Sequence, residues 1–243
     1  MQTKSVALVT GANKGIGFEI ARQLAEHEFT VVIAGRDQTK IDDAVARLDG
    51  KGHNVYGVVL DLTDSATIEA AVRWIDQRLG RLDVLINNAG VSLESGEQKR
   101  PSELQLETFK ATYETNVFGT FAVTKAMLSL LRKSTPSRII NQSSSMGSLG
   151  NLSDPTTPYY DNNILAYNSS KSAVNGITVA LAKDLAGEGI TVNSVCPGWV
   201  KTDLGGEAAP RTVEQGAAIA VRLATMDNPP TGKFLDDAGE IPW

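Results

Sequence analysis

The chain has 243 residues, of which 42% are hydrophobic and 21% are charged. These values are ordinary for a globular enzyme, and the length allows one large α/β domain with a well-buried core. The formal net charge of −5 argues against a general polyanion binder, so any cationic phosphate site has to be local.

Cysteine usage and hydropathy limit the cellular setting. Cys196 is the single cysteine, so no disulfide can form within the chain, and its place at the end of an apolar strand favours a buried, inert thiol. The first residues run directly into a predicted strand, which leaves no room for a signal peptide. No apolar run approaches the roughly 20 residues that span a bilayer. We expect a cytoplasmic protein with no membrane, nucleic-acid or metal partner.

Short apolar runs rich in β-branched residues alternate with helical patterns along the chain. The predicted strands cover residues 5–10, 30–34, 54–60, 83–87, 138–142, 191–195 and 233–235. Several runs are continuously apolar, which is typical of strands covered on both faces. The alternation predicts right-handed crossovers and a single-domain, doubly wound parallel sheet with helices on both faces, formed by residues 1–243.

Two helices have clear apolar faces, and two segments lack any periodicity. The first helix follows a glycine-rich segment, and the second has Asp64 or Ser65 available as its N-cap. Their apolar positions are Ile16, Ile20 and Leu24, and then Ile68, Val72, Ile75 and Leu79. The aperiodic segments are 92–102 and 147–163, and the second contains two prolines and is predicted to be a loop. Both segments follow strand ends, where open α/β sheets bind ligands.

The glycine-rich segment Thr10-Gly-Ala-Asn-Lys-Gly-Ile-Gly17 lies between the first strand and the first helix. Glycines there permit a tight turn and a close approach of the backbone to a pyrophosphate, and the helix N-terminus offers free N–H groups. The spacing differs from the common G-x-G-x-x-G fingerprint, so a glycine-rich turn without a ligand is the alternative.

The residues after the second strand bear on the choice of cofactor. A free ribose 2′-hydroxyl usually meets a carboxylate there, whereas a 2′-phosphate needs cations. Gly35 occupies the carboxylate's place and Arg36 follows it, while Lys14 adds a second cation. This pattern favours NADP(H), and the alternative is a solvated Arg36 with Asp37 on the ribose.

Three further residues carry candidate roles that the sequence alone does not separate. Asp61 ends the third strand and could accept a bond from an adenine amino group or cap a helix. Ser144 follows an apolar strand, where a hydroxyl can bind a substrate oxygen, but Ser143 and Ser145 adjoin it. Asn116 lies in an otherwise apolar helix, where it holds a proton-relaying water or bonds to neighbouring backbone.

Tyr167 and Lys171 are four residues apart in a helical segment, so their side chains share one face. A phenol with a pKa of about 10 is a poor acid–base catalyst, and a neighbouring ammonium is expected to lower that value. The tyrosine can then protonate a carbonyl that is being reduced or deprotonate an alcohol that is being oxidised. A solvent-facing pair is the alternative for this short motif.

Taken together, these segments resemble the short-chain dehydrogenase/reductase family over essentially the whole length of the chain. The matching segments also include Asn87-Asn-Ala-Gly90 and Pro197-Gly-Trp-Val-Lys-Thr202, and several stretches are similar to the NADPH-dependent carbonyl reductases. The resemblance implies a Rossmann-type fold and hydride transfer from NADPH to a ketone or aldehyde. A 3-oxoacyl carrier-protein reductase, or a cofactor-binding regulator without turnover, are the alternatives.

The resemblance also implies roles for individual residues. The implied catalytic group is Asn116, Ser144, Tyr167 and Lys171, with Ser144 on the substrate carbonyl and Tyr167 as the proton donor. The implied cofactor-binding residues are Gly11, Asn13, Lys14, Gly15, Ile16, Gly17, Arg36, Asp61, Leu62, Asn88, Ala89, Gly90, Tyr167, Lys171, Pro197, Gly198, Val200 and Thr202.

One departure from the family pattern concerns the substrate pocket. Ser144 and Tyr167 lie further apart than in most members, which places an insertion in 147–163. We expect loops 147–163 and 199–212 to shape the pocket, with an apolar rim that suits bulky hydrophobic carbonyl compounds. The expected rim residues are Leu149, Leu152, Tyr159, Tyr160 and Trp199. The insertion leaves the assembly open between a monomer and a homo-oligomer.

Overall fold

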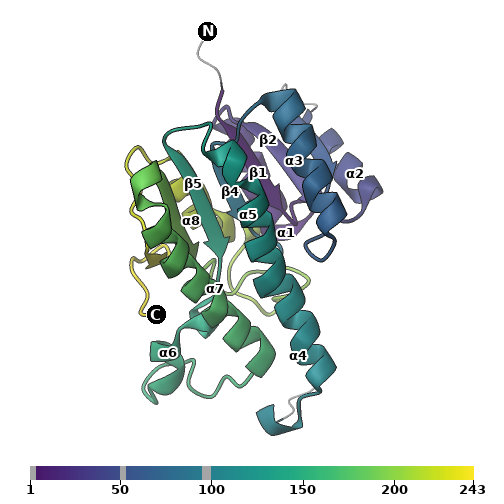
Figure 1. Cartoon of the computed structure of the whole chain (residues 1–243). Helices are drawn as coiled ribbons and strands as arrows, with labels where there is room; N and C mark the ends of the chain where they lie inside the picture. Colours follow the sequence, from purple (N-terminus) through teal and green to yellow (C-terminus); the bar gives the residue numbers. More distant parts are fainter. Residues whose placement is uncertain (1–3, 50–52, 95–99) are drawn as a thin grey trace.

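The computed structural model describes residues 4–49, 53–94 and 100–243 (Figure 1). Its centre is a seven-stranded, wholly parallel sheet with the order β3-β2-β1-β4-β5-β6-β7. The strands are β1 (Val6–Thr10), β2 (Thr30–Gly35), β3 (Val55–Val59), β4 (Val84–Asn87), β5 (Ser137–Gln142), β6 (Ile190–Val195) and β7 (Phe234–Leu235). Each strand matches a predicted one to within a residue at either end, and the predicted doubly wound sheet is confirmed.

The helices form a layer on each face of the sheet. They are α1 (Gly15–Glu26), α2 (Gln38–Asp49), α3 (Ser65–Leu79), α4 (Leu106–Tyr113), α5 (Thr120–Leu131), α6 (Leu149–Ser153), α7 (Leu165–Asp184) and α8 (Val213–Thr225). Ala7 and Val9 of β1 pack in the core that α1, α2 and α8 cover. Leu8, on the opposite face, packs with α3 and α5. Because both faces are covered, the strand is apolar at consecutive positions.

The second predicted helix begins as expected. The Asp64 carboxylate accepts a hydrogen bond from the N–H of Ala66 at 2.9 Å, so Asp64 rather than Ser65 is the N-cap of α3. Ile68 and Ile75 are buried, while Val72 and Leu79 are half-buried at the edge of the same face.

Beyond the carboxyl ends of the strands, α4, α6 and the first turns of α7 project as a separate lobe (Figure 1). A π-helical stretch, Glu114–Gly119, joins α4 to α5 without a break. A side chain on Gly119 would lie 2.6 Å from the Leu62 Cβ, so glycine lets this helix pass directly over the segment after β3. Residues 95–99 of the predicted 92–102 loop lie outside the described residues.

The prediction that 147–163 is entirely a loop is wrong in its first part. Residues 149–153 form α6, and the Ser148 hydroxyl caps this helix by accepting from the N–H of Asn151 at 3.1 Å. The Thr157 hydroxyl donates to the Asn151 carbonyl at 2.6 Å and ties the following turn back to α6. The two prolines lie after this helix, so they do not interrupt it.

Within the described ranges, no helix has the length and apolar character needed to cross a membrane. The same residues contain no group of three or more His, Cys, Asp or Glu side chains arranged to hold a metal ion.

Candidate active site

A cleft of about 1180 Å³ opens at the carboxyl edge of the sheet, where the strand order reverses between β1 and β4. Every residue predicted to bind the cofactor lines this cleft, and so does Ser144. Asn116 does not line it. The volume is large enough for a dinucleotide and a second small molecule, since drug-sized ligands occupy clefts of about 300–1,000 Å³.

The glycine loop forms the floor of the cleft next to β1. Gly11 and Gly15 have φ angles of +63° and +58°, which side-chain-bearing residues rarely adopt. A Cβ on Gly17 would lie 2.4 Å from the Asn88 Nδ2, so the loop, the start of α1 and the end of β4 are in direct contact. Lys14, at the N-cap of α1, makes no side-chain cap bond, which leaves N–H groups of the first turn for a ligand.

The segment after β4 is fixed to the glycine loop by a residue that sequence reasoning missed. The Thr10 hydroxyl accepts from the N–H groups of Asn88 and Ala89 at 3.0 and 3.1 Å. The Asn88 side chain donates back to the Thr10 carbonyl at 2.8 Å. Its place at the end of β1, beside the glycines, is the only sequence signal that Thr10 carries.

Arg36 and Lys14 are both exposed at the end of the cleft formed by β2 and the glycine loop. Lys14 is ion-paired with Asp203, and in the described part of the chain Arg36 has no ion-pair partner. The Asp37 carboxylate accepts from the N–H of Lys40 at 3.2 Å and pairs with the Lys40 ammonium, and these bonds lower its pKa. Asp37 therefore stabilises the start of α2, while the cations face the cleft.

The Asp61 side chain also bonds within its own turn. Its Oδ1 accepts from the N–H and the hydroxyl of Thr63 at 2.9 and 2.8 Å. Because Asp64 already caps α3, the simple capping role does not belong to Asp61. Asp61 lines the cleft, and its contact with an adenine stays a prediction.

The hydrogen bonds and burial of Ser143, Ser144 and Ser145 show which of the three hydroxyls is available to a substrate. The Ser143 hydroxyl is buried and donates to the Lys171 carbonyl at 3.3 Å. The Ser145 hydroxyl donates to the buried Cys196 sulfur at 3.2 Å. Ser144 alone of the three is only half-buried; its hydroxyl accepts from the N–H of Met146 at 3.2 Å and lies near enough to the Tyr167 phenol to lower its pKa. This leaves Ser144 as the serine that can bind a substrate oxygen.

Helix α7 carries Tyr167 and Lys171 on the face that lines the cleft, as their spacing predicts. The Lys171 ammonium lies 5.7 Å from the centre of the Tyr167 ring and donates to the Gln142 carbonyl at 2.8 Å. Lys171 is only 5% exposed, so the solvent-facing alternative does not hold.

Burial changes both pKa values in a way that the sequence argument did not anticipate. It raises the pKa of Tyr167 to about 12, against a smaller lowering by the Ser144 hydroxyl. It lowers the pKa of Lys171 to about 8. The expected lowering of the tyrosine pKa is therefore wrong for the protein alone, because desolvation of the phenolate is the largest influence on it. Tyr167 stays protonated, and so able to donate, across neutral pH.

The buried ammonium of Lys171 has a consequence for stability. Below pH 8 the folded protein carries a buried, charged Lys171 ammonium, whose desolvation lowers the free energy of unfolding. This cost disappears between about pH 8 and 10.5, because the folded state releases the proton at a lower pH than the unfolded state does. The difference between the folded and unfolded pKa values of Lys171 corresponds to roughly 3 kcal/mol at 1.36 kcal/mol per pH unit. A substitution that removes the ammonium also loses its bond to the Gln142 carbonyl, which offsets about 1 kcal/mol of that gain. We expect Lys171→Met to raise the free energy of unfolding at pH 7 and to gain less at pH 9.5.

Urea denaturation at both pH values measures this effect. Lys133→Met is the matched control, because Lys133 is half exposed in an ion pair with Asp76 and its removal changes little. A Lys171→Met protein that is less stable than the parent at pH 7 would contradict the expectation.

Asn116 lies in the π-helical stretch, where such distortions often mark functional sites. Its side-chain amide accepts from the N–H of Val91 and donates to the Val91 carbonyl, both at 2.8 Å, and also donates to the Ser170 hydroxyl at 3.0 Å. The structure shows the bonds to backbone, here to Val91, and the proton-relaying water stays a prediction. The Asn116 amide therefore joins Val91, in the segment after β4, to Ser170 of α7.

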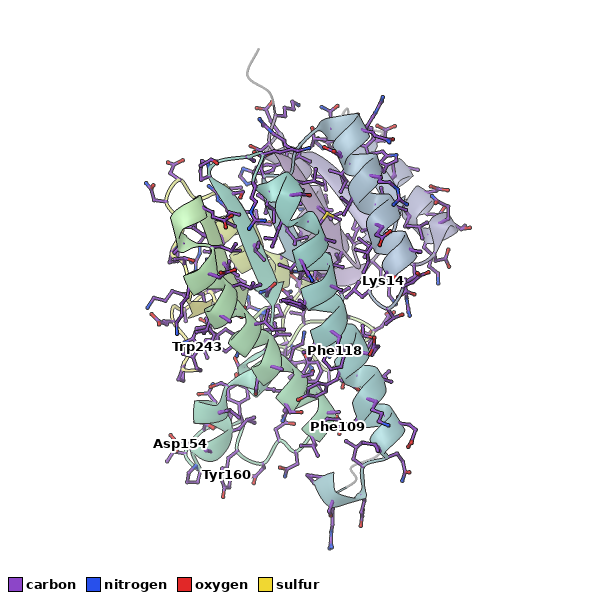
Figure 2. The ribbon with its side chains drawn as sticks, viewed as in Figure 1. Lys14, Phe109, Phe118, Asp154, Tyr160 and Trp243 are labelled. Carbon is purple, nitrogen blue, oxygen red and sulfur yellow. The ribbon has the colours of Figure 1, made fainter. Side chains whose placement is uncertain are left out.

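The apolar rim forms only in part from the expected residues. Tyr159 and Trp199 line the cleft, but Leu149, Leu152 and Tyr160 do not. Tyr160 is exposed, and in Figure 2 it lies near the bottom of the view, below Lys14. Pro158, Asn162 and Leu204, within the two predicted pocket loops, also line the cleft, as do Met146 and Ile164 outside them.

Known proteins resemble this chain over nearly its whole length. A family model described as short chain dehydrogenase matches residues 5–213. A short-chain dehydrogenase of Penicillium roqueforti is 38% identical over 247 residues, which cover 98% of this chain and 96% of that protein. Carbonyl reductase [NADPH] 1 of Mus musculus is 32% identical over 280 residues, which cover 99% of each.

The solved structures agree with the sequence matches. An NADPH-bound carbonyl reductase from chicken fatty liver superposes with a TM-score of 0.87 at 29% identity, with 100% of both chains covered. Its fold is that of the sheet and helix layers described above. The chain therefore belongs to the short-chain dehydrogenase/reductase family of oxidoreductases and is similar to its carbonyl reductases.

Proposed function

We propose that this protein is an NADPH-dependent carbonyl reductase that converts a ketone or aldehyde into an alcohol, with Tyr167 as the proton donor. The observation that carries the proposal is the placement of Ser144, Tyr167 and Lys171 together in one cleft, with the Lys171 ammonium 5.7 Å from the centre of the Tyr167 ring. These groups line the same cleft as the glycine loop and the cations at its far end.

The residues of the chain supply the acid and the electrostatic support for this reaction. NADPH, when bound, supplies the hydride to the carbonyl carbon. The Ser144 hydroxyl donates a hydrogen bond to the carbonyl oxygen as negative charge develops there. Tyr167, held neutral by burial, gives that oxygen its proton. The Lys171 ammonium favours this step, because it attracts the phenolate that forms.

The preference for NADPH rests on the charges at the β2 end of the cleft. A 2′-phosphate would gain charge-assisted bonds from Arg36, and from Lys14 when its ammonium exchanges Asp203 for the phosphate. The carboxylate that could accept bonds from a free 2′-hydroxyl belongs to Asp37, and it is occupied by Lys40.

Bulky, hydrophobic carbonyl compounds are the proposed substrates. Tyr159, Ile164 and Leu204 line the substrate end of the cleft together with Trp199, whose indole N–H donates to the Gly205 carbonyl at 2.7 Å. That bond leaves the aromatic surface of Trp199 for apolar contact, since the polar group of the indole is already satisfied. Such a rim favours apolar substrate surfaces over charged ones.

The first test is the oxidation of NADPH and NADH in the presence of aromatic ketones, aliphatic aldehydes, diketones and a 3-oxoacyl thioester. We expect turnover with NADPH on the bulky apolar ketones. Turnover confined to the thioester would replace the proposal by a 3-oxoacyl carrier-protein reductase. Tight binding of NADPH without turnover on any compound would favour a cofactor-binding regulator.

A further inference from the structure

Helix α7, which carries Tyr167, receives a cap from a distant segment. Ile164 stands at its N-cap, and an isoleucine side chain cannot accept a hydrogen bond. The Glu94 Oε2 instead accepts from the N–H of Tyr167 at 2.9 Å. First-turn N–H groups have no partner inside a helix, so Glu94 supplies to α7 what Asp64 supplies locally to α3.

The segment that ends in Glu94 also forms a wall of the cleft. Val91 and Ser92 line the cleft, and Asn116 holds both backbone groups of Val91. Asn116 in turn bonds Ser170, three residues after Tyr167. The segment is therefore attached to α7 at two residues. Asn116 links it to Ser170, and Glu94 links it to Tyr167, less than one helical turn away.

The chemistry of the Glu94 contact makes it a strong one. A carboxylate that accepts from a backbone N–H forms a charge-assisted bond, roughly twice as strong as a neutral one. Its negative charge also lies at the positive end of the α7 dipole. The bonded N–H belongs to the same residue as the proposed proton donor, so the contact restrains the backbone from which the phenol projects.

We propose that Glu94 is a positioning residue for carbonyl reduction. Its contact holds Tyr167 next to Ser144 and at a fixed position relative to Val91 and Ser92, which line the cleft. This inference rests on the proposed function. A displacement of about 1 Å at a reacting group can lower a rate by up to about 100-fold. The loss of this contact therefore acts on kcat more than on the binding of NADPH, whose phosphate loop lies at the other end of the cleft.

Two cap deletions on different helices test the proposal. Glu94→Ala removes the cap of α7, and Asp64→Ala removes the cap of α3, which lies outside the cleft. We expect both to lower the Tm by similar amounts. Only Glu94→Ala is expected to lower kcat for a ketone, by about tenfold, with the Kd of NADPH unchanged. Glu94→Gln, which keeps a neutral acceptor, is expected to restore kcat to within about threefold of the parent.

Amide hydrogen exchange of the peptide that begins α7 provides a readout independent of turnover. Faster exchange of this peptide in Glu94→Ala, but not in Asp64→Ala, supports the contact between Glu94 and α7. If the parent turns over no substrate, the same result keeps the contact and rejects only the proposed function. An active parent whose kcat falls equally in both variants would overturn the inference, and so would unchanged exchange in Glu94→Ala.

Discussion

Tyr167→Phe is expected to lower kcat for carbonyl reduction by about 10³-fold, because it removes the proposed proton donor and leaves the ring in place. General acid catalysis by a positioned group contributes about 10²–10⁴-fold in enzymes. The Kd of NADPH, measured by fluorescence titration, is expected to stay unchanged, since the substitution leaves the glycine loop, Arg36 and Lys14 as they are.

Tyr160→Phe is the matched control, because it makes the same chemical change on an exposed residue outside the cleft. It is expected to leave kcat and the Kd of NADPH as they are in the parent. A Tyr167→Phe enzyme that turns over at the parent's rate would remove Tyr167 from the role of acid. A loss of NADPH binding in that variant would instead assign the phenol to the cofactor.

Arg36→Asp is expected to reverse the preference between the two cofactors. The substitution removes up to two charge-assisted bonds, together about 3 kcal/mol, and places a negative charge beside the 2′-phosphate. At 1.4 kcal/mol per factor of ten, kcat/KM with NADPH falls about 100-fold. The new carboxylate can accept bonds from a free ribose 2′-hydroxyl, so kcat/KM with NADH rises.

Initial rates with both cofactors on one ketone give the ratio directly. Arg73→Asp changes the net charge equally but lies on the exposed side of α3, where Arg73 pairs with Glu69. It is expected to leave the ratio unchanged, which separates a local contact from a general field effect. A ratio in Arg36→Asp equal to that of the parent would show that the 2′-position is recognised elsewhere.

The strands and the glycine loop were predictable because their signals are local. A strand buried on both faces has to be continuously apolar, and a loop that approaches a pyrophosphate needs glycine at fixed places. Each of the seven strand predictions holds to within a residue. The order of the strands was not predicted, and the structure shows it to be β3-β2-β1-β4-β5-β6-β7.

The 147–163 segment shows where local signals end. Its prolines predicted a loop, but Ser148 caps a short helix whose backbone bonds the last residue, as the N–H of Gly150 donates to the Trp243 carbonyl at 2.9 Å. A contact between residues so far apart in sequence leaves no trace in the local pattern. In the same segment Tyr159 lines the cleft, whereas Tyr160 does not.

By itself the sequence determined the sheet, the glycine loop and the identity of the candidate acid, because these depend on residue type at short, regular spacing. Only the tertiary structure decided which serine faces Tyr167, that burial rather than the neighbouring ammonium dominates the phenol's pKa, and that Glu94 caps α7. These outcomes depend on desolvation and on contacts between distant segments, which arise only when the chain is packed.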